Sequence, residues 1–291
     1  MVRFMNNAKT ALLMGAMMGL FLLAGSYYGQ QGMIFALVFG GLMNFVAWFF
    51  SDKIALAAMR GREIRPDEGG VASELYHIVD ELRQRAGLPM PRVYICPQQA
   101  PNAFATGRSP SKAAVAVTEG ALRVLTLEEL RGVMAHELAH IKNRDTLTSA
   151  VAATIAGVLA YLAQWGWLMG GRDRDSNPIV MFVTMIIAAI GAAIIQATIS
   201  RSREFVADHD AAHIVGSPNG LVSALLKLEA LSQRIPLDNP NPAQNSMFIV
   251  EPLTGRGLTN LFATHPPTER RVEALRRIGA QMAGVHPAYS A

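Results

Sequence analysis

The stretch Leu130–Asp145, LRGVMAHELAHIKNRD, contains two histidines four residues apart, with a glutamate directly after the first. Residues four apart lie on the same face of an α-helix, so His136 and His140 can direct their imidazole nitrogens to one point. Neutral imidazole is a good zinc ligand, and a catalytic zinc site keeps one position open for water. Glu137 lies close enough to act as general base on that water. The pattern therefore predicts a metal-dependent hydrolytic site.

The surrounding residues indicate that this pattern lies on a helix. Thr126 and Glu129 have the spacing of a capping box, in which each side chain bonds the backbone N–H of the other residue. This helical context favours a zinc site over a chance match to five residues. The helix is also supported by an apolar stripe at helical spacing, which consists of Leu130, Val133, Met134, Leu138 and Ile141.

A zinc site of this kind needs a third protein ligand. The stretch 200–213, SRSREFVADHDAAH, offers Glu204, and Asp208 lies one turn further along the same helix face. Asp208 can accept the free ring N–H of a ligand histidine, which fixes the tautomer and orientation of that ring. The competing source of a ligand is the pair His209 and His213, although such an i,i+4 pair is more often a solvated surface feature.

Three separated motifs, taken in their order along the chain, resemble those of the M48 zinc metallopeptidases, and among them the bacterial membrane proteases. They are HELAHIKNRD at 136–145, SRSREFVAD at 200–208 and ATHPPTERRVEAL at 263–275. The likeness continues in NAFATG at 102–107 and in VAVTEGAL at 115–122.

The resemblance implies that His136, His140 and Glu204 bind one Zn²⁺ per chain, and that Glu137 is the catalytic base. It also implies a mainly α fold with a small β-sheet (α+β), in the form of a gluzincin-like zinc peptidase domain. The third motif is expected near the active site. Its His265 or Arg271 could stabilise the oxyanion of a tetrahedral intermediate, which makes His265 a candidate catalytic residue. The alternative is a helix N-terminus without a chemical role.

Composition points to a membrane protein. Of the 291 residues, 51% are hydrophobic and 16% are charged, whereas ordinary soluble domains carry roughly a quarter charged residues. The single Cys96 cannot form an internal disulfide, and no base near it in the sequence supports a catalytic thiol. The net charge of +4 comes without the basic and aromatic pattern typical of nucleic-acid binding, so it favours contact with anionic lipid.

The N-terminal part, residues 1–65, is expected to be a transmembrane hairpin followed by a basic linker from residue 51. Its apolar runs at 11–28 and 33–50 are each close to the ~20 residues that a bilayer requires. Lys and Arg residues flank this hairpin on both sides and are absent from the turn, which places both of its ends in the cytoplasm. The alternative is a hairpin buried in a soluble protein.

Two further apolar runs, at 147–170 and 179–199, divide the expected catalytic domain into parts 66–146 and 200–291. We predict a polytopic membrane protein with four spans and both termini cytoplasmic; alternatively, the second hairpin packs on the catalytic domain or dips into the bilayer. His140 lies seven residues before the third run, and Glu204 five after the fourth. At 1.5 Å per residue, the metal should lie within roughly 10 Å of the cytoplasmic membrane surface.

The remaining soluble elements are predicted from local patterns. Asp67 is expected to cap a helix over Gly69–Ala86, and another helix is expected over Gly220–Gln233. The Pro-rich loop at 236–242 is either a flap over the cleft or a surface loop. Strands are expected at Arg92–Cys96 and Ala113–Thr118.

Between these two strands, NAFATG is typical of an edge strand. Peptidases commonly bind substrate as an added strand on such an edge, so we expect main-chain contacts with substrate here. The alternative is an ordinary structural strand. The residues of the expected substrate edge are Asn102, Ala103, Phe104 and Ala105.

The resemblance implies a membrane-bound zinc endopeptidase of the bacterial inner membrane, with its catalytic domain in the cytoplasm. Its expected partners are the lipid bilayer and misfolded or damaged membrane proteins or unfolded polypeptides, which it would cut in cooperation with other quality-control proteases. No nucleic-acid partner is expected. Two alternatives remain open: a processing peptidase for a defined membrane or prenylated substrate, and a non-enzymatic membrane scaffold that keeps zinc for structure.

Overall fold

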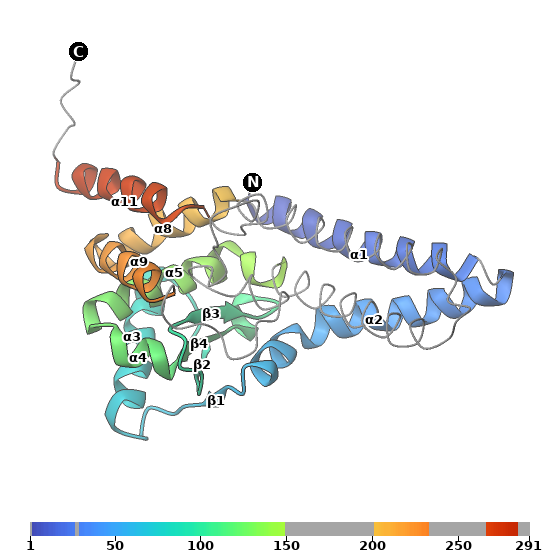
Figure 1. Ribbon diagram of the computed structural model, residues 1–291, viewed down its shortest axis with the longest axis horizontal. Coiled ribbons are helices and arrows are strands. Elements are labelled where there is room, and N and C mark those ends of the chain that lie inside the picture. Colours follow the sequence, from blue (N-terminus) through green and yellow to red (C-terminus); the bar gives the residue numbers. More distant parts are fainter. Residues whose placement is uncertain (1, 27–28, 149–200, 233–265, 285–291) are drawn as a thin grey trace, which may run out of the picture.

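The protein is mainly helical with a small mixed β-sheet, as predicted (Figure 1). The computed structural model describes residues 2–26, 29–148, 201–232 and 266–284. The third and fourth apolar runs beyond residue 148, the loop at 236–242 and His265 lie outside these described residues.

The two N-terminal apolar runs lie on two long helices that pack side by side, α1 (Val2–Ser26) and α2 (Gly29–Ala58) (Figure 1). Among the described helices, α2 is long and apolar enough to cross a membrane, with a mean hydropathy of 2.0. Many of its large apolar side chains are exposed in the isolated chain, which suits a surface that lipid would cover. These exposed residues include Phe35, Val38, Leu42, Phe45 and Trp48.

Helix α2 continues past the expected end of its apolar run. Residues 51–58 were expected to begin a linker, but they remain helical and pack on one face of the sheet. An ion pair of 2.7 Å between Asp52 and Arg92 fixes this end of α2 to the sheet. The buried cluster between helix and sheet consists of Ala55, Leu56, Met59, Tyr94, Cys96, Phe104, Ala114 and Ala116.

The sheet has the order β1-β2-β4-β3, with β3 at one edge as predicted for the NAFATG stretch. The pair β2–β4 is parallel, whereas β1–β2 and β3–β4 are antiparallel. Side chains alternate between the α2 face and the opposite face, where Val93, Val115 and Val117 join the main core. The strands are β1 (Arg62–Glu63), β2 (Arg92–Cys96), β3 (Ala103–Thr106) and β4 (Ala114–Thr118).

Helix α3 (Gly70–Ala86) covers that opposite face with Leu75, Val79 and Leu82. The predicted cap at Asp67 is wrong, because the helix starts after Gly69 without a side-chain cap. Gly69 and Gly70 both have positive φ (+74° and +57°), so the chain turns between Asp67 and the first helical turn.

Helix α5 (Leu127–Asn143) lies at the centre of the catalytic part and contacts α3, β3 and the later helices. The predicted capping box is confirmed: the backbone N–H of Thr126 donates to Glu129 (2.8 Å), and that of Glu129 donates to Thr126 (3.3 Å). Helix α11 packs against α8 and α9. The remaining helices are η1 (Pro110–Lys112), α4 (Glu119–Val124), α8 (Arg201–Val215), α9 (Asn219–Ser232) and α11 (Thr268–Met282).

Candidate metal centre

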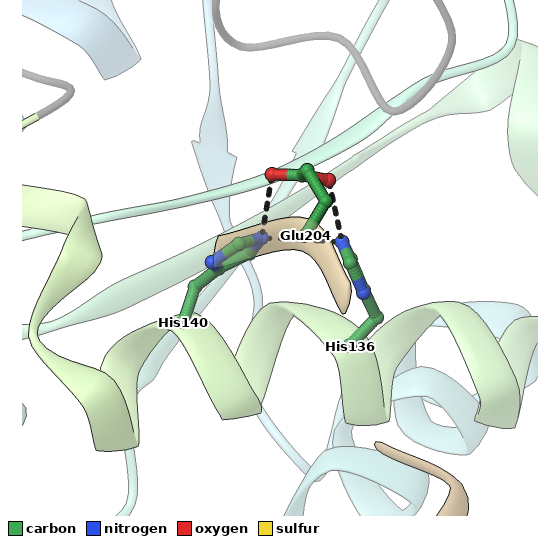
Figure 2. A group of neighbouring side chains, drawn as sticks. All are labelled: His136, His140 and Glu204. Carbon is green, nitrogen blue, oxygen red and sulfur yellow. Dashed lines mark hydrogen bonds and ion pairs between the residues drawn. The ribbon is translucent and has the colours of Figure 1, made fainter. Parts of the chain in front are cut away.

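The three residues predicted as ligands converge at one point between α5 and α8. Figure 2 shows the imidazoles of His136 and His140 rising from one face of α5 toward the carboxylate of Glu204 on α8. The Nε2 atoms of the two histidines are 3.1 Å apart. Each Nε2 atom lies 3.5 Å from an oxygen of Glu204, His136 from Oε2 and His140 from Oε1. His140 and Glu204 are 64 residues apart in the sequence, and packing of α5 against α8 brings them together.

These distances fit a small tetrahedral ion. With metal–ligand bonds of about 2.0–2.1 Å, the ligand atoms of a tetrahedral zinc lie about 3.3 Å from one another. The two Nε2 atoms are 3.1 Å apart, and each lies 3.5 Å from a different oxygen of the Glu204 carboxylate. Two imidazoles and one carboxylate at this spacing match the donor set of catalytic zinc sites, which leave the fourth position for water.

The charges around the site also favour a divalent cation. Among the residues that the structure describes, four buried carboxylates face two buried guanidinium groups, which leaves an excess of two negative charges when the histidines are neutral and the carboxyl groups ionised. An uncompensated buried charge is strongly destabilising, and one divalent ion would balance this excess. The carboxylates belong to Glu137, Asp145, Glu204 and Asp208, and the guanidinium groups to Arg203 and Arg271.

Behind His136 stands a closed chain of polar groups. Its Nδ1 lies 3.0 Å from Oδ1 of Asp208, which is fully buried. Arg271 from α11 binds both oxygens of Asp208, with Nε donating to Oδ2 (2.9 Å) and Nη2 to Oδ1 (2.7 Å). Its Nη1 also lies 3.4 Å from Glu204. Its Nη2 lies 3.4 Å from Nε2 of His136 as well, so Arg271, 1% exposed, is anchored against the ligands by a bidentate contact with Asp208.

Behind His140 stands a similar but looser chain. Its Nδ1 lies 3.1 Å from Oδ2 of the buried Asp145, and Oδ1 of Asp145 lies 3.8 Å from Nη1 of Arg203. The sequence interpretation missed both Asp145 and Arg203. Asp145 lies beyond the end of α5, where Arg144 adopts a left-handed conformation (φ 59°) that returns the chain toward His140. The available signal was an aspartate five residues after a predicted ligand.

The electrostatics of the metal-free site favour a positive charge at its centre. Burial lowers the pKa of His136, but the carboxylates of Asp208 and Glu204 outweigh burial and raise it to about 9. His136 would therefore carry a proton at neutral pH without a metal, and a divalent ion would replace that proton.

Glu137 has the environment of a general base. Its side chain is buried, and burial raises its pKa, although His136, His140 and a backbone hydrogen bond from Ala105 act in the opposite direction. A raised pKa brings a carboxylate closer to the working range of a proton carrier. The contact with Ala105 also places Glu137 beside the edge strand β3.

The other residues weighed from the sequence, whether predicted for the site or set aside, fall into three groups. Along the expected substrate edge, Asn102 and Phe104 have buried side chains, so the strand can offer substrate its backbone. His209 and His213 lie on α8 with their rings 4.4 Å apart, exposed and outside the ligand cluster. Finally, Cys96 is buried under α2, and burial raises the pKa of its thiol to about 12, which does not suit a nucleophile.

Comparison with known proteins found a matching family model and similar proteins that align over most of the chain. A family model described as Peptidase family M48 matches residues 71–279. A protein named Protease HtpX homolog from Desulfatibacillum aliphaticivorans is 51% identical over 288 residues, covering 96% of this chain and 92% of that protein. One of the same name from Acaryochloris marina is 48% identical over 288 residues, with 96% of each chain covered.

A solved structure shares the fold. The crystal structure of S. mikatae Ste24p aligns with a TM-score of 0.52 and 16% sequence identity, over 94% of this chain and 66% of that one. This chain therefore spans about two thirds of the length of that protein, and the likeness concerns the fold alone.

Proposed function

Because this chain belongs to peptidase family M48 and is a metallopeptidase, we propose that it is a zinc endopeptidase that hydrolyses misfolded or damaged membrane proteins. The observation that carries the proposal is the convergence of His136, His140 and Glu204 beside the buried Glu137. A purely structural metal site needs no such base, so the arrangement favours catalysis over a scaffold.

In the proposed mechanism, His136, His140 and Glu204 would hold the zinc. Zinc held there would lower the pKa of water and polarise the scissile carbonyl. The carboxylate of Glu137 would accept a proton from the attacking water and later pass it to the leaving amine as the peptide C–N bond breaks. Asp208 and Asp145 keep the ligand imidazoles oriented by facing their Nδ1 atoms.

The proposed substrate path follows the outer edge of β3, which no other strand pairs with among the described residues. An extended peptide can add to this edge as a further strand, held by main-chain hydrogen bonds that are independent of side-chain identity. Ala105 of β3 bonds to Glu137, so a strand along this edge would pass the proposed base. Broad recognition of this kind suits an enzyme that acts on unfolded or membrane polypeptides.

The proposed location is the cytoplasmic surface of a bacterial inner membrane, in a multi-pass protein. Support comes from α2, which runs without a break from its exposed apolar part to the sheet. Where the exposed apolar part of α2 meets the part that packs on the sheet, two cationic side chains lie over aromatic rings. These are Lys53 over Phe50 (5.4 Å) and Arg108 over Phe49 (4.1 Å). Aromatic and basic residues of this kind are typical of the membrane interface. Quality control together with other membrane proteases is the role we propose.

The proposal is tested by measuring metal content and cleavage of casein, an unfolded model substrate, with detergent-purified protein. We expect about one zinc per chain in both wild type and Glu137→Gln, and at least about 100-fold less cleavage in the variant. Glu128→Gln, a change at an exposed glutamate on the same helix, is the matched control and should cut normally. Absence of zinc from both proteins, or equal cleavage by wild type and Glu137→Gln, would overturn the proposal.

A further inference from the structure

Arg203 is a buried cation whose Nη1 and Nη2 atoms have no hydrogen-bond partner among the described residues. It lies on α8 directly before Glu204 and is 8% exposed. Its Nη1 and Nη2 atoms are fully buried, and no hydrogen-bond acceptor reaches them in the part of the chain that the structure describes. Burying a guanidinium in this way is unfavourable unless nearby negative charge compensates for it.

The compensating charges belong to the metal site. Burial lowers the pKa of Arg203, whereas the charges of Asp145 and Glu204 raise it. Asp145 is the closer contact, with Oδ1 at 3.8 Å from Nη1, and its other oxygen faces Nδ1 of His140 at 3.1 Å. One carboxylate therefore connects the guanidinium to a proposed zinc ligand.

The backbone around Asp145 is fixed independently of Arg203. The hydroxyl of Thr146 donates a hydrogen bond to the carbonyl oxygen of Gly107 (2.9 Å), and the N–H of Arg144 donates to the carbonyl oxygen of Ile141 (3.1 Å). These bonds restrain the residues on either side of Asp145, so Arg203 acts on the direction of the Asp145 side chain.

We infer that Arg203 is a positioning residue of the metal site, which holds the side chain of Asp145 directed at Nδ1 of His140. In this position Asp145 accepts the Nδ1–H of the ring, and Nε2 then presents its lone pair to the metal. An Asp145 side chain that turns away would leave the tautomer of His140 undetermined. This inference rests on the proposed zinc chemistry and adds a residue that acts through Asp145.

The first test compares Arg203→Gln and Arg203→Lys in the full-length protein in detergent. We expect Arg203→Gln to bind zinc up to about 10-fold more weakly in chelator competition, and no more weakly than Asp145→Asn, because Arg203 acts through Asp145. At saturating zinc, kcat should fall while KM stays unchanged. Lysine keeps the charge and should restore most of the affinity, which a merely space-filling role would not predict. Arg85→Gln, at an exposed arginine, is the control.

A second test asks whether Arg203 acts through Asp145. Adding Arg203→Gln to Asp145→Asn should weaken zinc binding little beyond Asp145→Asn alone, because the group on which Arg203 acts has already lost its charge. Fully additive losses would overturn the inference. So would unchanged zinc affinity in Arg203→Gln, and a raised KM with that unchanged affinity would instead indicate contact with substrate.

The outcomes for the two proposals are separable. If wild type binds no zinc, the proposed function fails. If wild type binds zinc and Arg203→Gln binds it equally well, the positioning role alone fails. Should Arg203→Gln not fold, as judged by thermal unfolding of the metal-free protein, Arg203→Lys paired with Asp145→Asn gives the same decision.

Discussion

His136 and His140 lie four residues apart on α5, yet the groups behind them are held in different ways. The chain His136–Asp208–Arg271 is closed by hydrogen bonds of 2.7 and 2.9 Å between α8 and α11. The chain His140–Asp145–Arg203 ends in an ion pair of 3.8 Å without a hydrogen bond. The first joins three helices and should contribute to overall stability, whereas the second should mainly adjust one ligand.

The largest effect should follow from opening the closed chain with Arg271→Met. This change leaves the fully buried Asp208 without its counter-charge, which typically destabilises a protein by about 3–5 kcal/mol. Chemical unfolding of the metal-free protein in detergent measures the loss. Arg277→Gln removes an exposed pair with Glu273 on the same helix and should change stability by less than about 0.5 kcal/mol. Equal losses of unfolding free energy for Arg271→Met and Arg277→Gln would contradict the contribution of the His136–Asp208–Arg271 chain to overall stability.

Neutralising the two carboxylates should weaken zinc binding to different degrees. Removing a partner of a metal-ligating histidine typically costs 10- to 100-fold in affinity, so we expect roughly 100-fold for Asp208→Asn and roughly 10-fold for Asp145→Asn. The larger loss follows from the tighter contacts of Asp208, which also hold Arg271 beside Glu204. Chelator competition measures both affinities, and a reversed order would show that contact length does not decide the contribution.

A change of Glu129 at the start of α5 should lower the stability of the helix that carries both His136 and His140. Burial raises the pKa of Glu129, but hydrogen bonds from Lys227, Ser223 and the backbone of Thr126 outweigh it and lower the pKa from 4.5 to about 2. Because the folded-state pKa is the lower one, the resulting stability is complete above about pH 4.5 and is lost as pH falls toward 2. Glu129→Gln should therefore lose roughly 1–2 kcal/mol at pH 7.

The measurement for Glu129 is the difference in unfolding free energy between wild type and Glu129→Gln at several pH values. This difference should shrink between pH 4.5 and 2, because the wild-type carboxylate becomes protonated there. A difference that stays constant over this range would show that the carboxylate charge is unimportant.

The smallest effect is expected from the second histidine pair. His209 and His213 share the i,i+4 spacing of the ligand pair, but they are exposed and lie outside the ligand cluster. His209→Ala combined with His213→Ala should change zinc affinity by less than about twofold. A large loss of zinc affinity in chelator competition would mean that the i,i+4 spacing alone identifies zinc ligands better than burial and position in the fold do.

The sequence predicted those features that depend on local periodicity. Helix α5 and its capping box follow from Thr126, Glu129 and the apolar stripe, and the edge position of β3 follows from a short alternating strand. Glu204 and Asp208 could be proposed because four residues make about one helical turn, which puts both on one face.

Features set by tertiary contacts could not be predicted in this way. The resemblance placed Arg271 near the active site as a candidate for oxyanion stabilisation, but its burial and its bidentate contact with Asp208 depend on the packing of α11 against α8. Asp145 is directed at His140 by the left-handed turn at Arg144, which breaks the helical period. Asp67 failed as a cap because two glycines with positive φ follow it.

The division of the metal site along the chain has a consequence for biosynthesis. His140 is translated 64 residues before Glu204 and 131 residues before Arg271. At about 5–20 residues per second, the ribosome needs about 3–13 s to pass from His140 to Glu204. During that interval the nascent chain has two histidines and the glutamate base but no complete ligand set. The emerging chain therefore cannot complete the proposed metal site before α8 is made, and Arg271 reaches the site only after that.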